Sequence, residues 1–318
     1  MKPLPYFGTA ALSLLAAALM AGCASWREPP PSDLSPRSLE DVRRSPAEST
    51  GQPKVALALG GGGLRGFAHL GVLTALEEAG IRPDIVVGTS AGAVVGAAYA
   101  SGKSPAEIEA IARSVKLSSL VDFAFSKSGL MRGDNIANWV NTLTGDVPIE
   151  HFPRRFAAVA TDLDTGRAVL LDRGPAGPAV RASAAVPGAH VPVAYGGGHL
   201  VDGGVASLVP VRFARALGAD VVIAVDVYCS GPGSDGLAAP SVLMRTLRVQ
   251  SCLVAQAEMA EADVLIAPQV RVSGMSAKGE QEGAIQAGYD AAVAALARHP
   301  ATLAATGPAA RRVTSASW

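Results

Sequence analysis

From Lys54 onward the chain alternates continuous apolar runs with helical segments, and this alternation limits the fold more than any other feature. The apolar runs have the length and composition of strands buried on both faces; they cover residues 54–60, 83–88, 155–163 and 219–227. Helical segments are predicted at residues 67–80, 91–102 and 279–299. The sequence therefore predicts an α/β protein with a mostly parallel central sheet and helices on both faces, a three-layer α/β/α arrangement.

The composition is that of a globular protein. With 318 residues, of which 49% are hydrophobic, the chain has enough apolar material for one large domain, or at most two. The 27 basic residues balance 27 acidic ones and form no basic run, so we exclude nucleic acid as a partner. No group of Cys and His residues has the spacing of a metal site, and we expect no metal and no cofactor.

The N-terminus has the pattern of an export signal. Lys2 precedes a stretch of apolar and small residues, 6–22, which ends in LMAGC at Cys23. This pattern resembles a bacterial lipoprotein signal, which implies a signal peptide over residues 1–22 and a diacylglyceryl group on Cys23. An uncleaved membrane anchor is disfavoured because the segment is shorter than the roughly 20 apolar residues that a span needs. Ala24 follows the cysteine where aspartate would signal inner-membrane retention, so we expect an outer-membrane lipoprotein that faces the periplasm.

Three further segments complete the predicted organisation. Residues 24–53 are rich in proline, serine and charge, so residues 23–53 are predicted to be a lipidated, flexible tether. The folded domain is predicted to span residues 54–299, and residues 300–318 to form a loose tail.

Within the domain, Cys229 and Cys252 would be able to pair in an oxidising compartment. Nothing in their spacing requires a bridge, and we expect two unpaired buried thiols.

A glycine-rich loop follows the first strand. In LGGGGLRG, Gly61, Gly63 and Gly66 spell G-x-G-x-x-G between a strand and a helix. Such a loop binds either a dinucleotide pyrophosphate or an oxyanion through its backbone N–H groups. A dinucleotide site also needs an acidic residue at the end of the second strand, and that strand ends in IVVGTS. A dinucleotide-binding oxidoreductase is therefore the least favoured function.

The second strand runs directly into GTSAG, residues 88–92. Glycines at 88 and 92 permit the sharp strand-to-helix turn of a nucleophile elbow, which exposes the Ser90 hydroxyl at a helix N-terminus. The alternative is that Ser90 only caps the helix. Because a glycine-rich loop ends the neighbouring strand, we favour Ser90 as a nucleophile.

Ser90 needs a base, and no histidine is well placed by the sequence to supply one. His299 ends the closing helix before a proline, where surface exposure is expected, and His69 is expected to pack beside the glycine loop. The others are His151, His190 and His199. A Ser-His-Asp triad stays open as the weaker alternative.

A carboxylate is the stronger candidate. In GGGHLVDGGVASLVPV, residues 196–211, Asp202 ends a short apolar strand and is followed by two glycines. Alone, an Asp-Gly pair after a strand favours a simple turn.

Together, GGGLRG at 61–66, GTSAG at 88–92 and DGG at 202–204 resemble the patatin-like phospholipases. The resemblance extends through stretches such as VRASAAVPG and covers nearly all of the chain from Lys54 to His299. It implies the patatin-like α/β/α fold, with Ser90 as nucleophile and Asp202 as its base. It also implies an oxyanion hole of backbone N–H groups, contributed by Gly61, Gly62 and Gly63. The remaining motif positions are Arg65, Gly66, Gly88, Gly92, Gly203 and Gly204. One departure is Ser207, which stands where bacterial members often carry asparagine.

The resemblance predicts a serine hydrolase of lipid esters, similar to phospholipase A or lysophospholipase, that acts through an acyl-enzyme on membrane lipids. An esterase, a thioesterase or an acyltransferase on the same dyad is an alternative, as is a lipoprotein that binds lipid without catalysis. The sequence leaves the oligomeric state and any protein partner open.

Residues 116–149 supply a candidate wall for an acyl-chain groove near Ser90. The apolar side chains there are Leu120, Phe123, Phe125, Leu130, Met131 and Trp139. A helix packed into the core explains them equally well.

Overall fold

The computed structural model describes residues 31–45, 53–124, 126, 128–233 and 237–300. The expected signal peptide, Cys23 and nearly all of the expected tail lie outside these residues. Their assignment therefore stays a prediction.

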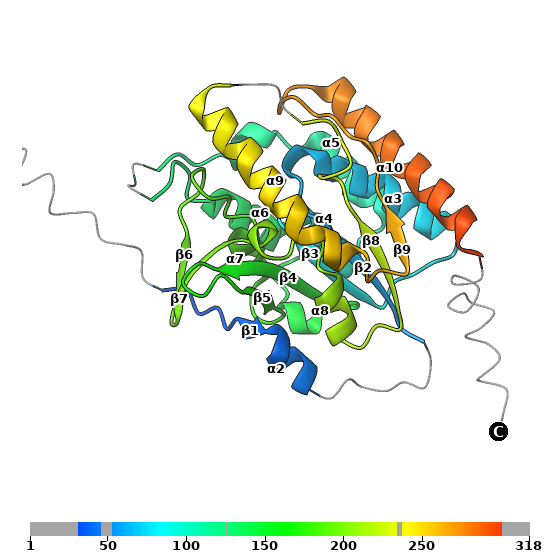
Figure 1. Cartoon of the computed structure of the whole chain (residues 1–318), viewed down its shortest axis with the longest axis horizontal. Helices are drawn as coiled ribbons and strands as arrows, with labels where there is room; N and C mark the ends of the chain where they lie inside the picture. The colour runs from blue at the N-terminus through cyan, green and yellow to red at the C-terminus, as the bar shows by residue number, and fades with distance from the viewer. Residues whose placement is uncertain (1–30, 46–52, 125, 127, 234–236, 301–318) are drawn as a thin grey trace, which may run out of the picture. The chain divides into compact units, whose positions relative to one another are not determined.

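Within the described residues, a nine-stranded sheet forms the centre of the domain (Figure 1). The strands are β1 (Arg37–Ser38), β2 (Val55–Leu59), β3 (Ile85–Thr89), β4 (Arg155–Asp162), β5 (Ala168–Leu171), β6 (Val193–Tyr195), β7 (Gly198–Asp202), β8 (Val221–Val225) and β9 (Val264–Ile266). The main order is β1-β5-β4-β3-β2-β8-β9, and β7 pairs with both β4 and β6. Strands β4, β3, β2, β8 and β9 are mutually parallel. The predicted α/β class with a mostly parallel sheet is confirmed.

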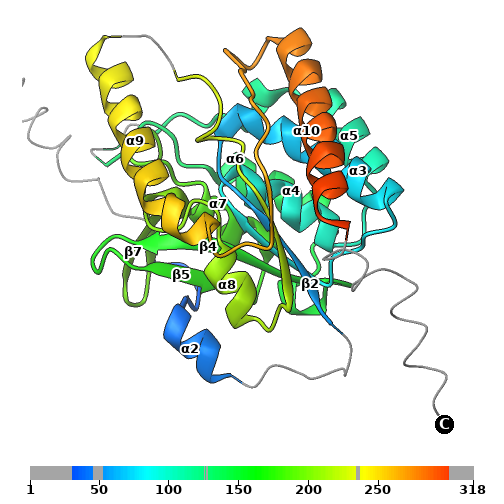
Figure 2. The same cartoon turned by 45° about the vertical axis from the view of Figure 1, so that its right-hand side comes forward.

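Helices cover both faces of this sheet (Figure 2). The α-helices are α2 (Leu39–Arg44), α3 (Ala68–Glu78), α4 (Ala91–Ala100), α5 (Pro105–Ser114), α6 (Asp134–Leu143), α7 (Ala176–Ser183), α8 (Val211–Ala216), α9 (Ala239–Met259) and α10 (Lys278–Arg298). Short 3-10 helices are η1 (Gly63–Phe67), η2 (Leu117–Leu120), η3 (Ile149–His151) and η4 (Gly203–Val205). Within the described part of the chain, no helix is both long enough and apolar enough to cross a bilayer.

The sheet separates two hydrophobic cores because successive side chains of a strand point to opposite faces. In β2, Leu57 and Leu59 face the core built with α3, α4, α5, α6, α7 and α10. Ala56 and Ala58 face the other core, which α2, α8 and α9 cover. All five residues of β2 are buried, which explains the continuous apolar run in the sequence.

The segment before Lys54 differs from the prediction. Residues 32–45 do not form a free tether but fold onto the domain. β1 pairs with β5, Arg37 forms a 2.6 Å ion pair with Asp172, and Val42 is buried. Ser38 and Asp41 form a capping box that begins α2. The proline- and charge-rich composition hid this short helix because its apolar contacts come from just two side chains, buried Val42 and partly buried Leu39.

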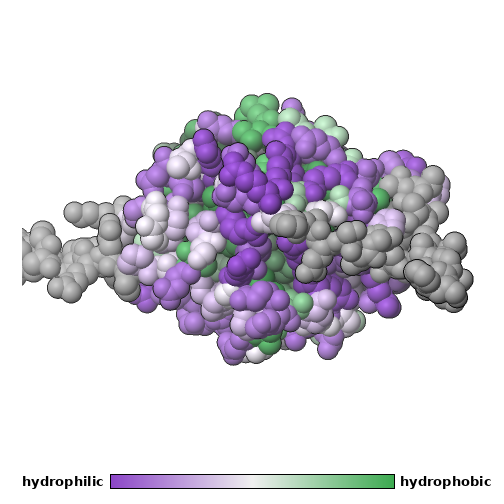
Figure 3. Space-filling view, turned by 90° about the horizontal axis from the view of Figure 1, so that it is seen from below, coloured by the Kyte–Doolittle hydropathy of each residue, from purple (hydrophilic) through white to green (hydrophobic). Residues whose placement is uncertain are grey.

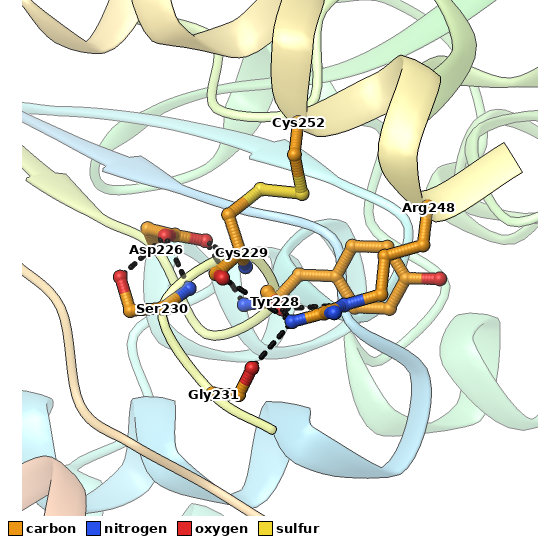
Figure 4. Close-up of a disulfide and its surroundings, with 7 residues drawn as sticks. All are labelled: Asp226, Tyr228, Cys229, Ser230, Gly231, Arg248 and Cys252. Carbon is orange, nitrogen blue, oxygen red and sulfur yellow. Dashed lines mark hydrogen bonds between the residues drawn. A yellow bond between two sulfur atoms is a disulfide. The ribbon is translucent and has the colours of Figure 1, made fainter. Parts of the chain in front are cut away.

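The prediction of unpaired thiols is wrong, because Cys229 and Cys252 form a disulfide (Figure 4). The bond joins the loop after β8 to α9, two segments 23 residues apart. On the loop side, Asp226 accepts hydrogen bonds from the N–H groups of Tyr228 and Cys229. On the helix side, Arg248 donates to the carbonyls of the same two residues. The loop fold brings the two sulfur atoms together, and sequence spacing does not encode that approach.

We predict that Cys252→Ser lowers the free energy of unfolding by about 3 kcal/mol, because a closed loop of this length restricts the unfolded chain by roughly that amount. Urea denaturation of the oxidised protein measures the change. The parent chain in a strong reductant should fall to the stability of the variant. Equal stability of the oxidised and reduced parent chain would contradict the prediction.

Candidate active site

A cavity of about 320 Å³ opens at the carboxyl ends of the parallel strands. Its lining includes Ser90, Asp202, the glycines 61–63 and Arg65. The three separate sequence motifs therefore meet at one place. This edge of the sheet is also where ligand sites form in α/β folds.

Ser90 occupies a strained turn between β3 and α4. Its backbone has φ 53° and ψ −119°, a conformation that residues other than glycine rarely adopt. The turn is tight because a Cβ on Gly92 would lie 2.1 Å from the Leu59 carbonyl oxygen. Ser90 is only 7% exposed. The strand, turn and helix around it have the arrangement of a nucleophile elbow.

Strand β4 brings Ser90 and Asp202 together. β3 runs parallel to β4 and ends with Thr89 opposite Val159. β7 runs antiparallel to β4 and ends with Asp202 opposite Ala160. The two strands therefore approach each other end to end along β4, and their last residues face neighbouring positions.

Ser183 holds the backbone of Ser90 in place. The Ser90 N–H donates to the Ser183 hydroxyl at 2.9 Å, and that hydroxyl donates to the Val159 carbonyl at 2.6 Å. Ser183 is fully buried at the end of α7. The three sequence motifs predict no role for this residue. The signal was its place within VRASAAVPG, one of the stretches that carry the resemblance.

Burial controls the charge of Asp202. The carboxyl is 7% exposed, and its removal from water raises its pKa from 3.8 to about 6. Two hydrogen bonds, from the Ser90 side chain and from the Gly204 N–H at 2.7 Å, act in the opposite direction. The carboxylate is therefore a stronger base than an ordinary aspartate, yet it is ionised at neutral pH.

The glycine loop lies against the same cavity, but its N–H groups differ in their partners. The Gly61 N–H donates to the Leu208 carbonyl at 3.1 Å. No backbone carbonyl of the described residues accepts from the N–H of Gly62 or Gly63. These two groups can therefore bind an oxyanion, while Gly61 fixes the loop.

His69 supports this loop from the core. Its ring is fully buried, and Nε2 lies 2.8 Å from the Gly60 carbonyl; because a carbonyl only accepts, Nε2 carries the proton. Burial lowers the pKa of His69 to about 4, so the ring is neutral at pH 7. All five histidines lie within the described residues, and none lines the cavity.

The other motif residues have structural contacts. Arg65 donates to the carbonyls of Pro232 and Val270, and its guanidinium lies 5.4 Å from the centre of the Tyr228 ring. A Cβ on Gly66 would lie 2.8 Å from the Ala91 side chain, and one on Gly203 would lie 2.2 Å from the Val159 carbonyl oxygen. Close packing therefore requires glycine at both positions.

Ser207 and Glu258 connect the Asp202 loop to α9. The Ser207 hydroxyl donates to the Glu258 carboxylate at 3.0 Å, and the Arg212 N–H donates to it at the same distance. Thr89, next to Ser90, donates to the Ser207 carbonyl. Burial raises the pKa of Glu258. The departure at position 207 therefore has its own buried partner, which lies 51 residues away and which sequence analysis missed.

The apolar wall of the cavity comes from elements other than those expected. It includes Val186, Leu208, Met244, Leu247 and Val272. The described residues of the segment 116–149, which exclude 125 and 127, contribute none of the lining, so the groove hypothesis is wrong for them. Trp139 packs against the core, whereas Phe123 and Leu130 are 83% and 64% exposed. Phe125 lies outside the described residues.

Three comparisons with known proteins bear on this site. Residues 57–215, half of the chain, match the family model described as patatin-like phospholipase. An uncharacterized NTE family protein of Mycobacterium tuberculosis is 40% identical over 63% of this chain and 58% of its own length. A protein named lysophospholipase NTE1 from Coccidioides immitis is 35% identical over 58% of this chain and 13% of its own. The chain thus spans less than two thirds of these relatives.

Among solved structures, VipD from Legionella pneumophila has a similar fold. Its TM-score is 0.56 and its sequence identity 14%, over 89% of this chain and 73% of that one.

We predict that Asp202→Asn stabilises the fold at neutral pH. The folded protein holds the Asp202 proton up to about pH 6, whereas the unfolded chain releases it near 3.8, so stability is lost as pH rises between these values. Removal of the charge should raise the free energy of unfolding by up to about 3 kcal/mol above pH 6, and by less at pH near 4.

Urea denaturation of the parent chain and of Asp202→Asn, above pH 6 and near pH 4, measures the gain in the free energy of unfolding. Asp33→Asn, at an exposed position, is the control and should change little. A gain that does not depend on pH would contradict the assignment.

Proposed function

The chain belongs to the patatin-like phospholipase family, and on that premise we propose that it is a serine hydrolase that cleaves acyl esters of membrane lipids with Ser90 and Asp202. One observation carries the proposal. A serine in a strained elbow and a buried aspartate with a pKa of about 6 line the same cavity, which has apolar walls. This combination provides a nucleophile, its base and space for an acyl chain.

In the first step, the Asp202 carboxylate accepts the hydroxyl proton of Ser90 while Oγ forms a bond to the ester carbonyl carbon. The N–H groups of Gly62 and Gly63 donate to the oxyanion, and Gly61 positions the loop. When the tetrahedral intermediate collapses, the bond to the alcohol oxygen breaks. Asp202 returns the proton to that oxygen, and the alcohol or lysolipid leaves an acyl group on Ser90.

In the second step, Asp202 accepts a proton from water while the water oxygen attacks the acyl carbon. The bond to Ser90 then breaks, and the proton passes from Asp202 to Oγ. The products are a fatty acid and the free enzyme. An Asp202 carboxyl with an ordinary pKa would be a poorer base for both steps, so its burial supports this assignment.

The cavity and the relatives support a lipid substrate. Apolar side chains such as Leu208, Met244 and Leu247 provide a surface for an acyl chain. The fungal relative is named a lysophospholipase, and it is 35% identical to this chain over 207 residues. We therefore place phospholipids and lysophospholipids first among the acyl esters that the dyad would cleave.

A fluorophosphonate with a long alkyl chain tests the proposal, because it labels only an activated serine. We predict an adduct at Ser90 by mass spectrometry, and its loss in Ser90→Ala. Labelling should be constant above pH 6 and fall about tenfold per pH unit below it, as the Asp202 carboxylate becomes protonated.

Asp202→Asn should reduce labelling by at least about a hundredfold, which is the usual effect of loss of a positioned base. Asp162→Asn is a matched control: Asp162 is also buried but does not line the cavity, and labelling should persist. Folded protein that is not labelled at Ser90 would favour a lipid-binding protein without catalysis. Labelling followed by acyl transfer to an added alcohol, faster than hydrolysis, would assign an acyltransferase.

We also propose that Cys23 carries a diacylglyceryl group and tethers the domain to the periplasmic face of the outer membrane. The Cys229–Cys252 disulfide supports an oxidising compartment. Mass spectrometry of the mature N-terminal peptide should show Cys23 as the first residue, with the lipid attached. A mature chain that begins at Met1 without lipid would contradict this proposal.

A further inference from the structure

Helix α9 carries an unusually apolar exposed surface. Among the described residues, seven of the fifteen exposed large hydrophobic side chains lie between Leu237 and Val254. Five of them form what we name the outer face of α9: Val242, Leu243, Val249, Leu253 and Val254. Leu253 is 62% exposed and Val249 is 57% exposed. A surface helix normally presents charged and polar residues to water, so this apolar face has the character of a binding surface.

The face shown in Figure 3 is mostly hydrophilic, and its hydrophobic residues form small separate groups. Isolated exposed apolar side chains are ordinary in proteins, whereas a row of them along one helix indicates a binding surface.

The inner face of α9 is bound to the rest of the domain by a disulfide and by hydrogen bonds. The exposure of its apolar residues therefore does not come from separation of the helix from the domain. Cys252 forms the disulfide, and Arg248, one turn before it, donates to loop carbonyls (Figure 4). Next to Met259, the last residue of α9, Glu258 accepts from the Ser207 hydroxyl and from the Arg212 N–H. These contacts leave the outer face directed to solvent.

The outer face of α9 continues into the proposed active site. Met244 is 39% exposed and also lines the cavity that holds Ser90. Val205, from η4, has the same two properties. A methyl group of Leu243 lies 3.8 Å from the position that a Cβ on Gly188 would take, one residue from the cavity-lining Pro187. Exposed apolar side chains of α9 and η4 therefore also form part of the cavity lining.

We propose that the outer face of α9 docks on a lipid bilayer and that acyl chains pass over Met244 into the cavity. This inference rests on the proposed hydrolase function. It names a lipid surface as the occupant because a protein partner or a second copy seated there would close the cavity mouth to substrate. The charges agree with a bilayer: residues 237–257 contain no Asp or Glu, and the exposed charged residue of α9 is Arg245.

The test compares two substrates with the full-length chain. One is a vesicle of phosphatidylcholine and phosphatidylglycerol, and the other is p-nitrophenyl butyrate, which is monomeric in water. The double variant Val249→Gln, Leu253→Gln changes the outer face at positions that do not line the cavity. We expect vesicle hydrolysis to fall about tenfold or more, because two apolar anchors are lost, while butyrate hydrolysis is unchanged. The N-terminal segment is the same in the parent chain and in the double variant, so its own affinity for the membrane does not contribute to the difference between their rates.

Val293→Gln is the matched control. Val293 is 46% exposed on α10, which covers the other face of the sheet, and this variant should leave both rates unchanged. A direct measurement uses Leu253→Trp and Val293→Trp in vesicles that contain brominated lipid. We expect additional quenching, relative to the parent chain, only for Leu253→Trp.

Each remaining outcome is decisive. No activity of the parent chain on either substrate would refute the hydrolase function, not the docking surface. Active parent chain with equal vesicle rates in parent and double variant would overturn docking through α9. A parallel fall in both rates would assign α9 to the shape of the cavity instead. Dimerisation of the parent that the double variant abolishes, with vesicle hydrolysis unchanged, would make a second copy the occupant.

Discussion

The site depends on the pairing of two strands with one edge of β4. β3 approaches from one end and β7 from the other, and their last residues face Val159 and Ala160. Backbone hydrogen bonds therefore set the separation of Ser90 and Asp202, because strand register leaves little freedom along the ladder. The Val159 carbonyl also accepts the hydrogen bond that fixes Ser183, which in turn binds the Ser90 N–H. One stretch of β4 thus positions the proposed nucleophile, its proposed base and Ser183, which supports the elbow.

Two features of this arrangement are unfavourable to folding. Ser90 has a positive φ, which residues other than glycine rarely adopt, and the Asp202 carboxyl is buried with few polar partners. The surrounding structure tolerates both because β2, β3 and β4 are packed on both faces. Strain and burial at functional positions are common in enzymes, because a reactive group must be kept in a state that water would otherwise relax.

Helix α9 relates the site to the outside of the molecule. Its inner face lines the cavity and is held by the disulfide, by Arg248 and by Glu258. The Glu258 contact reaches Ser207, whose carbonyl binds Thr89 beside the proposed nucleophile. A helix attached this firmly can present apolar side chains to a lipid surface and still keep the cavity wall in shape. The sequence prediction assigned the acyl-chain groove to residues 116–149, whose described residues do not line the cavity.

The sequence alone determined the α/β class, the strands and helices around the motifs, and the three motifs that meet in the cavity. Apolar runs, glycines at tight turns and residues next to strand ends are local signals, so one chain suffices to detect them. It did not reveal Ser183, Glu258, the disulfide or the apolar wall from α9. Each of these depends on a contact between segments far apart in the chain, and no local pattern encodes such a distance. The short helix α2 was missed because just two apolar side chains, Val42 and Leu39, pack it against the core. The tertiary structure alone decided which glycine N–H groups are available and how deeply Asp202 is buried. Both depend on strands and loops packed around them, and it is this burial that raises the pKa of the Asp202 carboxyl.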